Sequence, residues 1–132
     1  MAHNGISVLV VDDNDHQHEL FKVYSMMSSR VDTLHALSLQ EALPMLSTDS
    51  PDLVLMDHRL HPYDSFQDTI PLVRAAGYDG CLVVISADVN DRDFADAAEL
   101  GVTRCLNKFD FTLENFDDLV IGVLDEFRKT AD

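Results

Sequence analysis

Short apolar runs that end on polar residues recur along this chain. The clearest is Leu53–Met56, four large apolar residues followed at once by Asp57. A run of this length with polar ends is typical of a strand buried on both faces, as in a parallel sheet. On the same grounds, further strands are predicted at Ile6–Val11, Thr33–Ala36, Cys81–Ile85 and Arg104–Leu106. The pattern is weak only in Thr33–Ala36.

Between these strands, apolar residues recur at helical spacing, and capping signals mark where helices begin and end. Ser38 and Glu41 form a capping-box pattern before the second helix. The other helices are predicted at about Asp15–Ser28, at Thr69–Ala76 with Gly77 as the stop, from Asn90–Asp93 to a stop at Gly101, and at Leu113–Arg128 with Thr112 as the cap.

Five β–α units in succession predict an α/β fold, because a strand followed by a crossover helix leads back to a parallel neighbour. The expected architecture is a single doubly wound, flavodoxin-like, five-stranded parallel sheet in the order 2-1-3-4-5, with five helices. We expect one domain over residues 1–132, in which residues 1–5 form a loose N-terminal arm.

The composition narrows the possible partners. With 24 acidic against 9 basic residues the net charge is -15, which argues against direct binding to nucleic acid or to an anionic membrane. Basic protein partners and divalent cations suit this charge, although solubility alone explains it equally well. Cys81 and Cys105 lie inside predicted strands, so we expect reduced thiols in a cytoplasmic protein without a signal peptide.

Polar residues with distinct chemistry follow the predicted strands. Asp12 and Asp13 come after the first, Asp57 after the third and Ser86 after the fourth, and Lys108 lies just beyond the fifth. Since the carboxyl ends of parallel strands share one edge, these side chains should meet there. Three carboxylates repel one another, and Mg²⁺, which prefers oxygen ligands, relieves that repulsion. With a hydroxyl and an ammonium nearby, Asp57 is predicted to be a nucleophile that accepts a phosphoryl group.

These segments together carry a family resemblance. In the order Val10-Val11-Asp12-Asp13-Asn14, Leu55-Met56-Asp57, Ile85-Ser86-Ala87 and Asn107-Lys108, they resemble the receiver domain of two-component response regulators, of the chemotaxis-regulator-like kind. The resemblance covers Ile6–Arg128. It implies that Asp57 takes a phosphoryl group from a histidine kinase or a phosphotransfer protein, and that a protein–protein interface then changes.

The resemblance also implies a role for each site residue. Asp13 would bind Mg²⁺ directly and Asp12 largely through water, while Asp57 and the backbone carbonyl of Arg59 complete the protein ligands. Ser86 and Lys108 would contact the phosphoryl oxygens. The domain would act in the bacterial cytoplasm on a downstream protein or a fused output domain. It would be a phosphoryl acceptor with slow self-catalysed phosphorylation and dephosphorylation rather than an enzyme.

The chain departs from the family pattern in its switch region. Phe109 follows the lysine where the family usually has proline after a cis bond, so the loop is either trans and rearranged or strained. Cys105 replaces an aromatic residue that swings inward on activation. Leu60-His61 and Ser65 replace a common Met-Pro and a later Gly.

Other interpretations remain open. A haloacid-dehalogenase-like phosphatase would need an Asp-x-Asp nucleophile motif that Asp12–Asp15 does not supply, and a flavodoxin-like cofactor binder would need a hydroxyl- and glycine-rich loop there. A pseudo-receiver could signal by protein contact without phosphorylation. His58 and His61 are expected to be solvent-exposed or to tune the site rather than to bind metal. Arg59 and Asp88 could pair as a gate over the site or act independently.

Overall fold

The sheet has five parallel strands in the order β2-β1-β3-β4-β5. This computed structural model describes residues 5–87 and 95–131. The strands are β1 (Ile6–Val11), β2 (Val31–Ala36), β3 (Leu53–Asp57), β4 (Cys81–Ser86) and β5 (Arg104–Asn107). The strand order confirms the predicted flavodoxin-like fold class.

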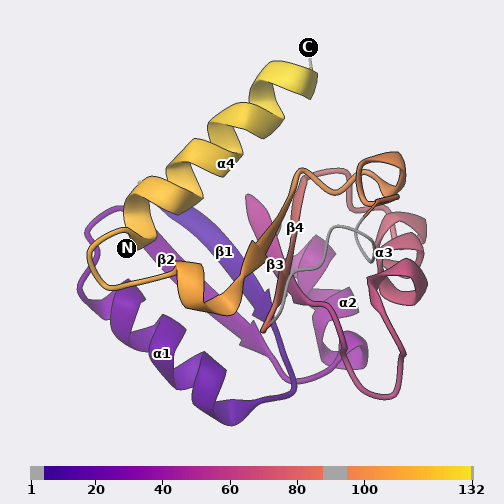
Figure 1. Cartoon of the computed structure of the whole chain (residues 1–132), viewed down its shortest axis with the longest axis horizontal. Coiled ribbons are helices and arrows are strands. Elements are labelled where there is room, and N and C mark those ends of the chain that lie inside the picture. Colours follow the sequence, from indigo (N-terminus) through magenta and orange to yellow (C-terminus); the bar gives the residue numbers. More distant parts are fainter. Residues whose placement is uncertain (1–4, 88–94, 132) are drawn as a thin grey trace.

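Helices cover both faces of the sheet (Figure 1). They are α1 (Asp15–Met26), α2 (Leu39–Thr48), α3 (Phe66–Ala75) and α4 (Phe116–Ala131), with two 3₁₀ turns, η1 (Ala98–Leu100) and η2 (Lys108–Asp110). None of these helices is long and apolar enough to cross a membrane. The sheet, with α1 and α4 on one face and α2 and α3 on the other, forms three layers.

Alternate residues of the inner strands pack into two separate hydrophobic cores, one on each face of the sheet. On the α2 and α3 face lie Leu9, Val11, Val54, Met56, Leu82 and Val84. On the α1 and α4 face lie Val8, Val10, Leu53, Leu55, Val83 and Ile85. In this core the ring centroids of Phe21 from α1 and Phe116 from α4 lie 6.0 Å apart. Burial on both faces explains why these strands read as continuous apolar runs rather than as alternating patterns.

The predicted count of five helices is wrong for the described part of the chain, which has four α-helices. Near the predicted fourth helix the described chain forms only the short turn η1, which ends at Gly101 with a φ of 89°. The predicted helix start at Asn90–Asp93 lies outside the described residues, as do residues 1–4 of the predicted arm.

The third helix begins earlier than predicted. It starts at Phe66 rather than Thr69, because the Ser65 side chain accepts a hydrogen bond from the amide of Gln67 at 3.2 Å and caps the helix. Phe66 and Ile70 are completely buried, so the apolar stripe already includes the first turn.

The last helix begins later than predicted, at Phe116 instead of Leu113. Thr112 and Asn115 bond to each other, with the Asn115 amide donating to Thr112 Oγ1 at 3.1 Å and the Thr112 amide donating to Asn115 Oδ1 at 2.7 Å. This turn satisfies the polar groups before the helix and leaves Leu113 half-exposed.

Candidate functional site

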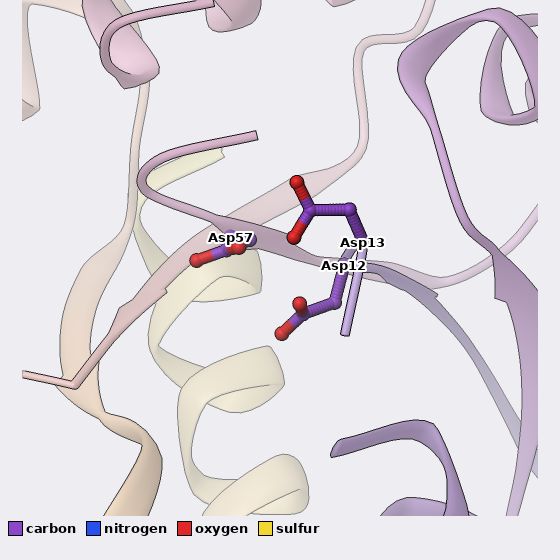
Figure 2. A group of neighbouring side chains, drawn as sticks. All are labelled: Asp12, Asp13 and Asp57. Atoms are coloured by element: carbon purple, nitrogen blue, oxygen red, sulfur yellow. The ribbon is translucent and has the colours of Figure 1, made fainter. Parts of the chain in front are cut away.

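Three carboxylates meet where β1 and β3 end. The register pairs Val11 with Met56, so Asp12 and Asp57 follow on neighbouring strands. One oxygen from each of Asp12, Asp13 and Asp57 lies within 4.8 Å of the others. Figure 2 shows the three side chains directed toward a common space. Asp12 and Asp57 are buried and Asp13 is exposed, so the cluster runs from the interior of the protein to its surface.

Local hydrogen bonds hold the loop after β1 in place. The Asn14 amide donates to Asp12 Oδ1 at 2.9 Å, and Asn14 Oδ1 in turn caps α1 by accepting from the His16 amide at 2.9 Å. The Asp13 carboxylate accepts from the His61 amide at 3.1 Å. The acidic loop therefore begins a helix, as short polar residues after a strand often do, and it also anchors the loop that follows β3.

Lys108 reaches this cluster from the end of β5. Its Nζ lies 2.8 Å from Asp12 Oδ2 and 3.3 Å from Asp57 Oδ1. Among the described residues the only cis peptide bond is His61–Pro62, so Lys108–Phe109 is trans. The chain turns directly into η2, where the Asn107 amide donates to Asp110 Oδ2 at 3.0 Å, and this is the rearranged alternative of the two expected for this loop.

The electrostatics of the site follow from burial and from neighbouring charges. Burial and then the Asp12 carboxylate raise the pKa of Asp57, Lys108 lowers it, and the balance leaves this pKa at about 6. For Lys108, burial lowers the pKa, but Asp12 and Asp57 outweigh burial and leave the pKa above its usual value. At neutral pH the lysine is therefore charged, and Asp57 is largely ionised.

The residues of the cluster fit a hard divalent cation. Three carboxylates face the Lys108 ammonium, which leaves a net negative charge among these four groups. Asp12 Oδ2 is buried and accepts no well-directed hydrogen bond within the described residues, although it forms the ion pair with Lys108. An all-oxygen set of this kind suits Mg²⁺, and the exposure of Asp13 leaves room for metal-bound water.

The remaining predicted site residues surround the cluster. Ser86 is buried and follows Ile85, which is in register with Asp57. Arg59 has an exposed side chain. The roles predicted for the Ser86 hydroxyl and the Arg59 carbonyl stay predictions. Asp88, the other half of the predicted gate, lies outside the described residues.

His58 corrects one expectation. Its side chain is only 6% exposed, because the ring packs on Phe66 at a centroid distance of 5.3 Å and Nδ1 accepts from the Phe66 amide at 3.5 Å. Of the two roles predicted for this histidine, solvent exposure is excluded and tuning of the site remains. His61 is exposed as predicted.

The sequence did not single out His18 and His35. His18, on α1, is buried, with only 3% of its surface exposed. Its Nε2 lies 2.6 Å from the backbone oxygen of Asp12, and its Nδ1 lies 2.7 Å from Nδ1 of His35. Two histidines in different elements, without a fixed spacing between them, give no sequence signal for such a contact.

Comparisons with known proteins agree on one family. The family model described as "Response regulator receiver domain" matches residues 8–120. A response regulator receiver protein from Pseudomonas putida is 29% identical, with a TM-score of 0.75 over 89% of this chain and 97% of that one. A search of curated proteins finds no match.

More distant structures share the fold. The receiver domain of the Francisella response regulator 1452 is 22% identical, with a TM-score of 0.75 over 96% of this chain and 99% of that one. A CheY-like receiver domain protein from Methanospirillum hungatei is 15% identical, with a TM-score of 0.78 over 96% of this chain and 98% of that one. With the family match over most of its length, this chain belongs to the response regulator receiver domain family.

Proposed function

We propose that this receiver domain accepts a phosphoryl group on Asp57 from the phosphohistidine of a histidine kinase or phosphotransfer protein, with Mg²⁺ as cofactor. The observation that carries the proposal is the convergence of Asp12, Asp13 and Lys108 on the buried Asp57 carboxylate. Family membership supports a role in two-component signalling. The proposed domain is the whole chain, 1–132, acting in the cytoplasm without binding nucleic acid or membrane.

The chemistry assigns one task to each residue. An oxygen of Asp57 attacks phosphorus, an acyl phosphate bond forms, and the phosphorus–nitrogen bond to the donor histidine breaks with its electron pair going to nitrogen. A phosphohistidine that is protonated on its other ring nitrogen leaves directly as neutral imidazole, and an unprotonated one becomes neutral by taking up one proton from water. With a pKa of about 6, Asp57 is largely the required carboxylate at neutral pH. Lys108 and Ser86 would contact the phosphoryl oxygens, which carry the charge of the transition state.

Mg²⁺ held by Asp12, Asp13, Asp57 and the Arg59 carbonyl would supply charge neutralisation for the incoming phosphoryl group. The three carboxylates leave a local excess of negative charge that would otherwise repel this group. For this reason phosphorylation should stop when the metal is removed.

The proposed output is a changed interface with a downstream protein or a fused domain. The residue three before the lysine is Cys105, which is half-buried against the core on the α2 and α3 face. A thiol offers no large ring to swing inward, so the change in the interface must proceed without that movement. A domain that signals by contact alone is the competing possibility, and the labelling experiment separates the two.

The test is labelling by acetyl phosphate, read as a gain of one phosphoryl mass on the intact protein. Wild-type protein should be labelled with Mg²⁺ present and not with EDTA, and Asp57→Asn should remain unlabelled. Asp79→Asn is the matched control and should be labelled normally. Asp79 is exposed and lies just before β4, at the opposite edge of the sheet.

Two results would contradict the proposal. Undiminished labelling of Asp57→Asn would place the acceptor elsewhere. Absence of any change in wild-type protein with either acetyl phosphate or beryllofluoride would favour signalling by contact alone.

A further inference from the structure

A chain of hydrogen bonds runs from β2 through α1 to the backbone of the acidic loop. Thr33 Oγ1 lies 2.8 Å from His35 Nε2, and His35 Nδ1 lies 2.7 Å from His18 Nδ1. His18 Nε2 then lies 2.6 Å from the backbone oxygen of Asp12. The chain therefore joins the edge strand of the sheet to the first residue of the proposed magnesium site.

The donors and acceptors in this chain have one consistent direction when both rings are neutral. A carbonyl oxygen only accepts, so His18 carries its proton on Nε2 and its Nδ1 is an acceptor. His35 must then donate from Nδ1, which leaves its Nε2 to accept from the Thr33 hydroxyl. The Asp12 carbonyl thus fixes the tautomer of His18, His18 fixes that of His35, and the Thr33 hydroxyl completes the chain as a donor.

The surroundings of His35 favour its neutral form. Burial, together with the nearby His18 and Lys22, lowers the pKa of His35 to about 4. At neutral pH His35 therefore keeps an acceptor nitrogen for Thr33 and a donor nitrogen for His18.

The oxygen that receives the last hydrogen bond belongs to the peptide between Asp12 and Asp13. Holding this oxygen restricts rotation of the peptide, and the directions of both carboxylates depend on that rotation. The Asp12 amide is held as well, since it donates to the Ala36 carbonyl at 3.1 Å. Both sides of Asp12 are thus tied to the same strand, one directly through Ala36 and the other through the histidines.

We propose that His18 and His35 are positioning residues that hold the Asp12–Asp13 peptide in the orientation needed for both carboxylates to bind one cation. The inference rests on the proposed function, because it assigns the pair a role in the magnesium site. It differs from a packing role, in which the rings would only fill space between α1 and β2.

The first test is the tautomeric state of the two rings. At a pH well above the ordinary histidine pKa of about 6.5, ¹⁵N NMR of imidazole nitrogens should show His18 protonated at Nε2 and His35 at Nδ1. In Thr33→Val the donor to His35 Nε2 is gone, so the Nδ1-protonated form of His35 should lose population. A His35 ring protonated mainly at Nε2 in the wild-type protein would overturn the proposal.

The second test is the dissociation constant for Mg²⁺, measured by calorimetric titration with the metal alone. His18→Leu removes the donor to Asp12, whereas His18→Gln keeps an N–H close to the Nε2 position. The leucine variant should bind Mg²⁺ about tenfold more weakly, as is usual when a group behind a metal ligand is lost, and the glutamine variant should recover most of the affinity. His16→Leu, which changes an exposed histidine of α1, should bind normally.

Substitutions of His35, which is less buried, test the same hydrogen-bond chain without changing the buried His18. His35→Asn keeps an N–H near the Nδ1 position, and His35→Phe does not, so only the phenylalanine variant should weaken Mg²⁺ binding and slow labelling by acetyl phosphate. A folded His35→Phe protein with wild-type affinity for Mg²⁺ would refute the positioning role.

Failure of this inference is distinguishable from failure of the proposed function. If wild-type protein binds Mg²⁺ and is labelled, but the histidine variants bind Mg²⁺ and are labelled as well as wild-type protein, only the positioning role of His18 and His35 is refuted. If the tautomers are as stated but wild-type protein binds no Mg²⁺, the magnesium part of the proposed function is refuted and the positioning role with it.

Discussion

The Lys108 ammonium lies 2.8 Å from Asp12 Oδ2, an oxygen buried at the end of strand β1. Its distance to the proposed acceptor Asp57 is longer, at 3.3 Å. Lysine therefore neutralises the innermost carboxylate of the site in the absence of a cation. In the proposed function a metal and a phosphoryl group bind here, and this ion pair would then have to loosen so that the ammonium can reach a phosphoryl oxygen.

Lys108→Met should destabilise the metal-free protein. Removing the ammonium leaves two buried carboxylates facing each other, and loss of one partner of a buried ion pair costs about 3 kcal/mol in the free energy of unfolding. Urea denaturation at neutral pH with EDTA measures this cost.

Lys129→Met is the matched control, because Lys129 is exposed near the end of α4. It should change the free energy of unfolding by less than about 0.5 kcal/mol. Equal effects of the two substitutions would contradict a specific role for Lys108 in balancing the carboxylates.

Mg²⁺ should raise the thermal stability of the wild-type protein. A ligand that binds only the folded state at ten times its dissociation constant adds about 1.4 kcal/mol, which corresponds to a rise in Tm of about 3–6 °C for a domain of this size. Differential scanning calorimetry with and without millimolar Mg²⁺ measures the rise.

Asp13→Asn should abolish most of that rise, since Asp13 is the carboxylate predicted to contact the metal directly. Asp15→Asn, an exposed carboxylate at the start of α1, should keep it. Superimposable melting curves of wild-type protein in Mg²⁺ and in EDTA would exclude a magnesium site of useful affinity.

His35 should make folding sensitive to acid. Its pKa of about 4 in the folded protein is below the ordinary value of 6.5, so the unfolded chain binds the proton more tightly. Stability linked to this group is fully present above the unfolded pKa and is lost as the pH falls from 6.5 toward 4.

His35→Asn cannot take up this proton and should lose less stability over the same range. After allowance for partial solvent screening, the two proteins should differ by about 1 kcal/mol in their loss of unfolding free energy between pH 7.5 and 5. Urea denaturation in EDTA at both pH values measures this difference. His16→Asn, a change of an exposed histidine, is the control. Equal losses in wild-type protein and His35→Asn would show that His35 keeps an ordinary pKa.

Local patterns were sufficient for the fold and for the members of the acidic cluster. The apolar run Leu53–Met56, bounded by polar residues, is typical of a doubly buried strand, and a polar residue directly after such a strand lies at the carboxyl edge of the sheet. The carboxyl ends of Ile6–Val11 and Leu53–Met56 therefore predicted that Asp12, Asp13 and Asp57 lie together. The β–α alternation predicted a parallel, doubly wound sheet, and the order 2-1-3-4-5 was expected from the flavodoxin-like arrangement of such sheets.

Helix boundaries were less well predicted, because they depend on packing as much as on capping residues. Phe66 is buried at the start of α3, which moved that helix three residues earlier than Thr69. Leu113 finds no core position, and α4 starts at Phe116 after a turn closed by Asn115. The competing caps at these ends are all acceptable locally, and burial in the assembled core selects among them.

By itself, the sequence determined which segments form strands and which acidic residues lie at their carboxyl ends, since these follow from periodicity and from the positions of polar residues at strand ends. Tertiary structure alone decided that Lys108 lies nearer to Asp12 than to Asp57 and that His18 meets His35 behind the acidic loop. Such distances join elements far apart in the chain, and they are set by how α1, β2 and β5 pack against the central strands. Periodicity carries no information on that packing.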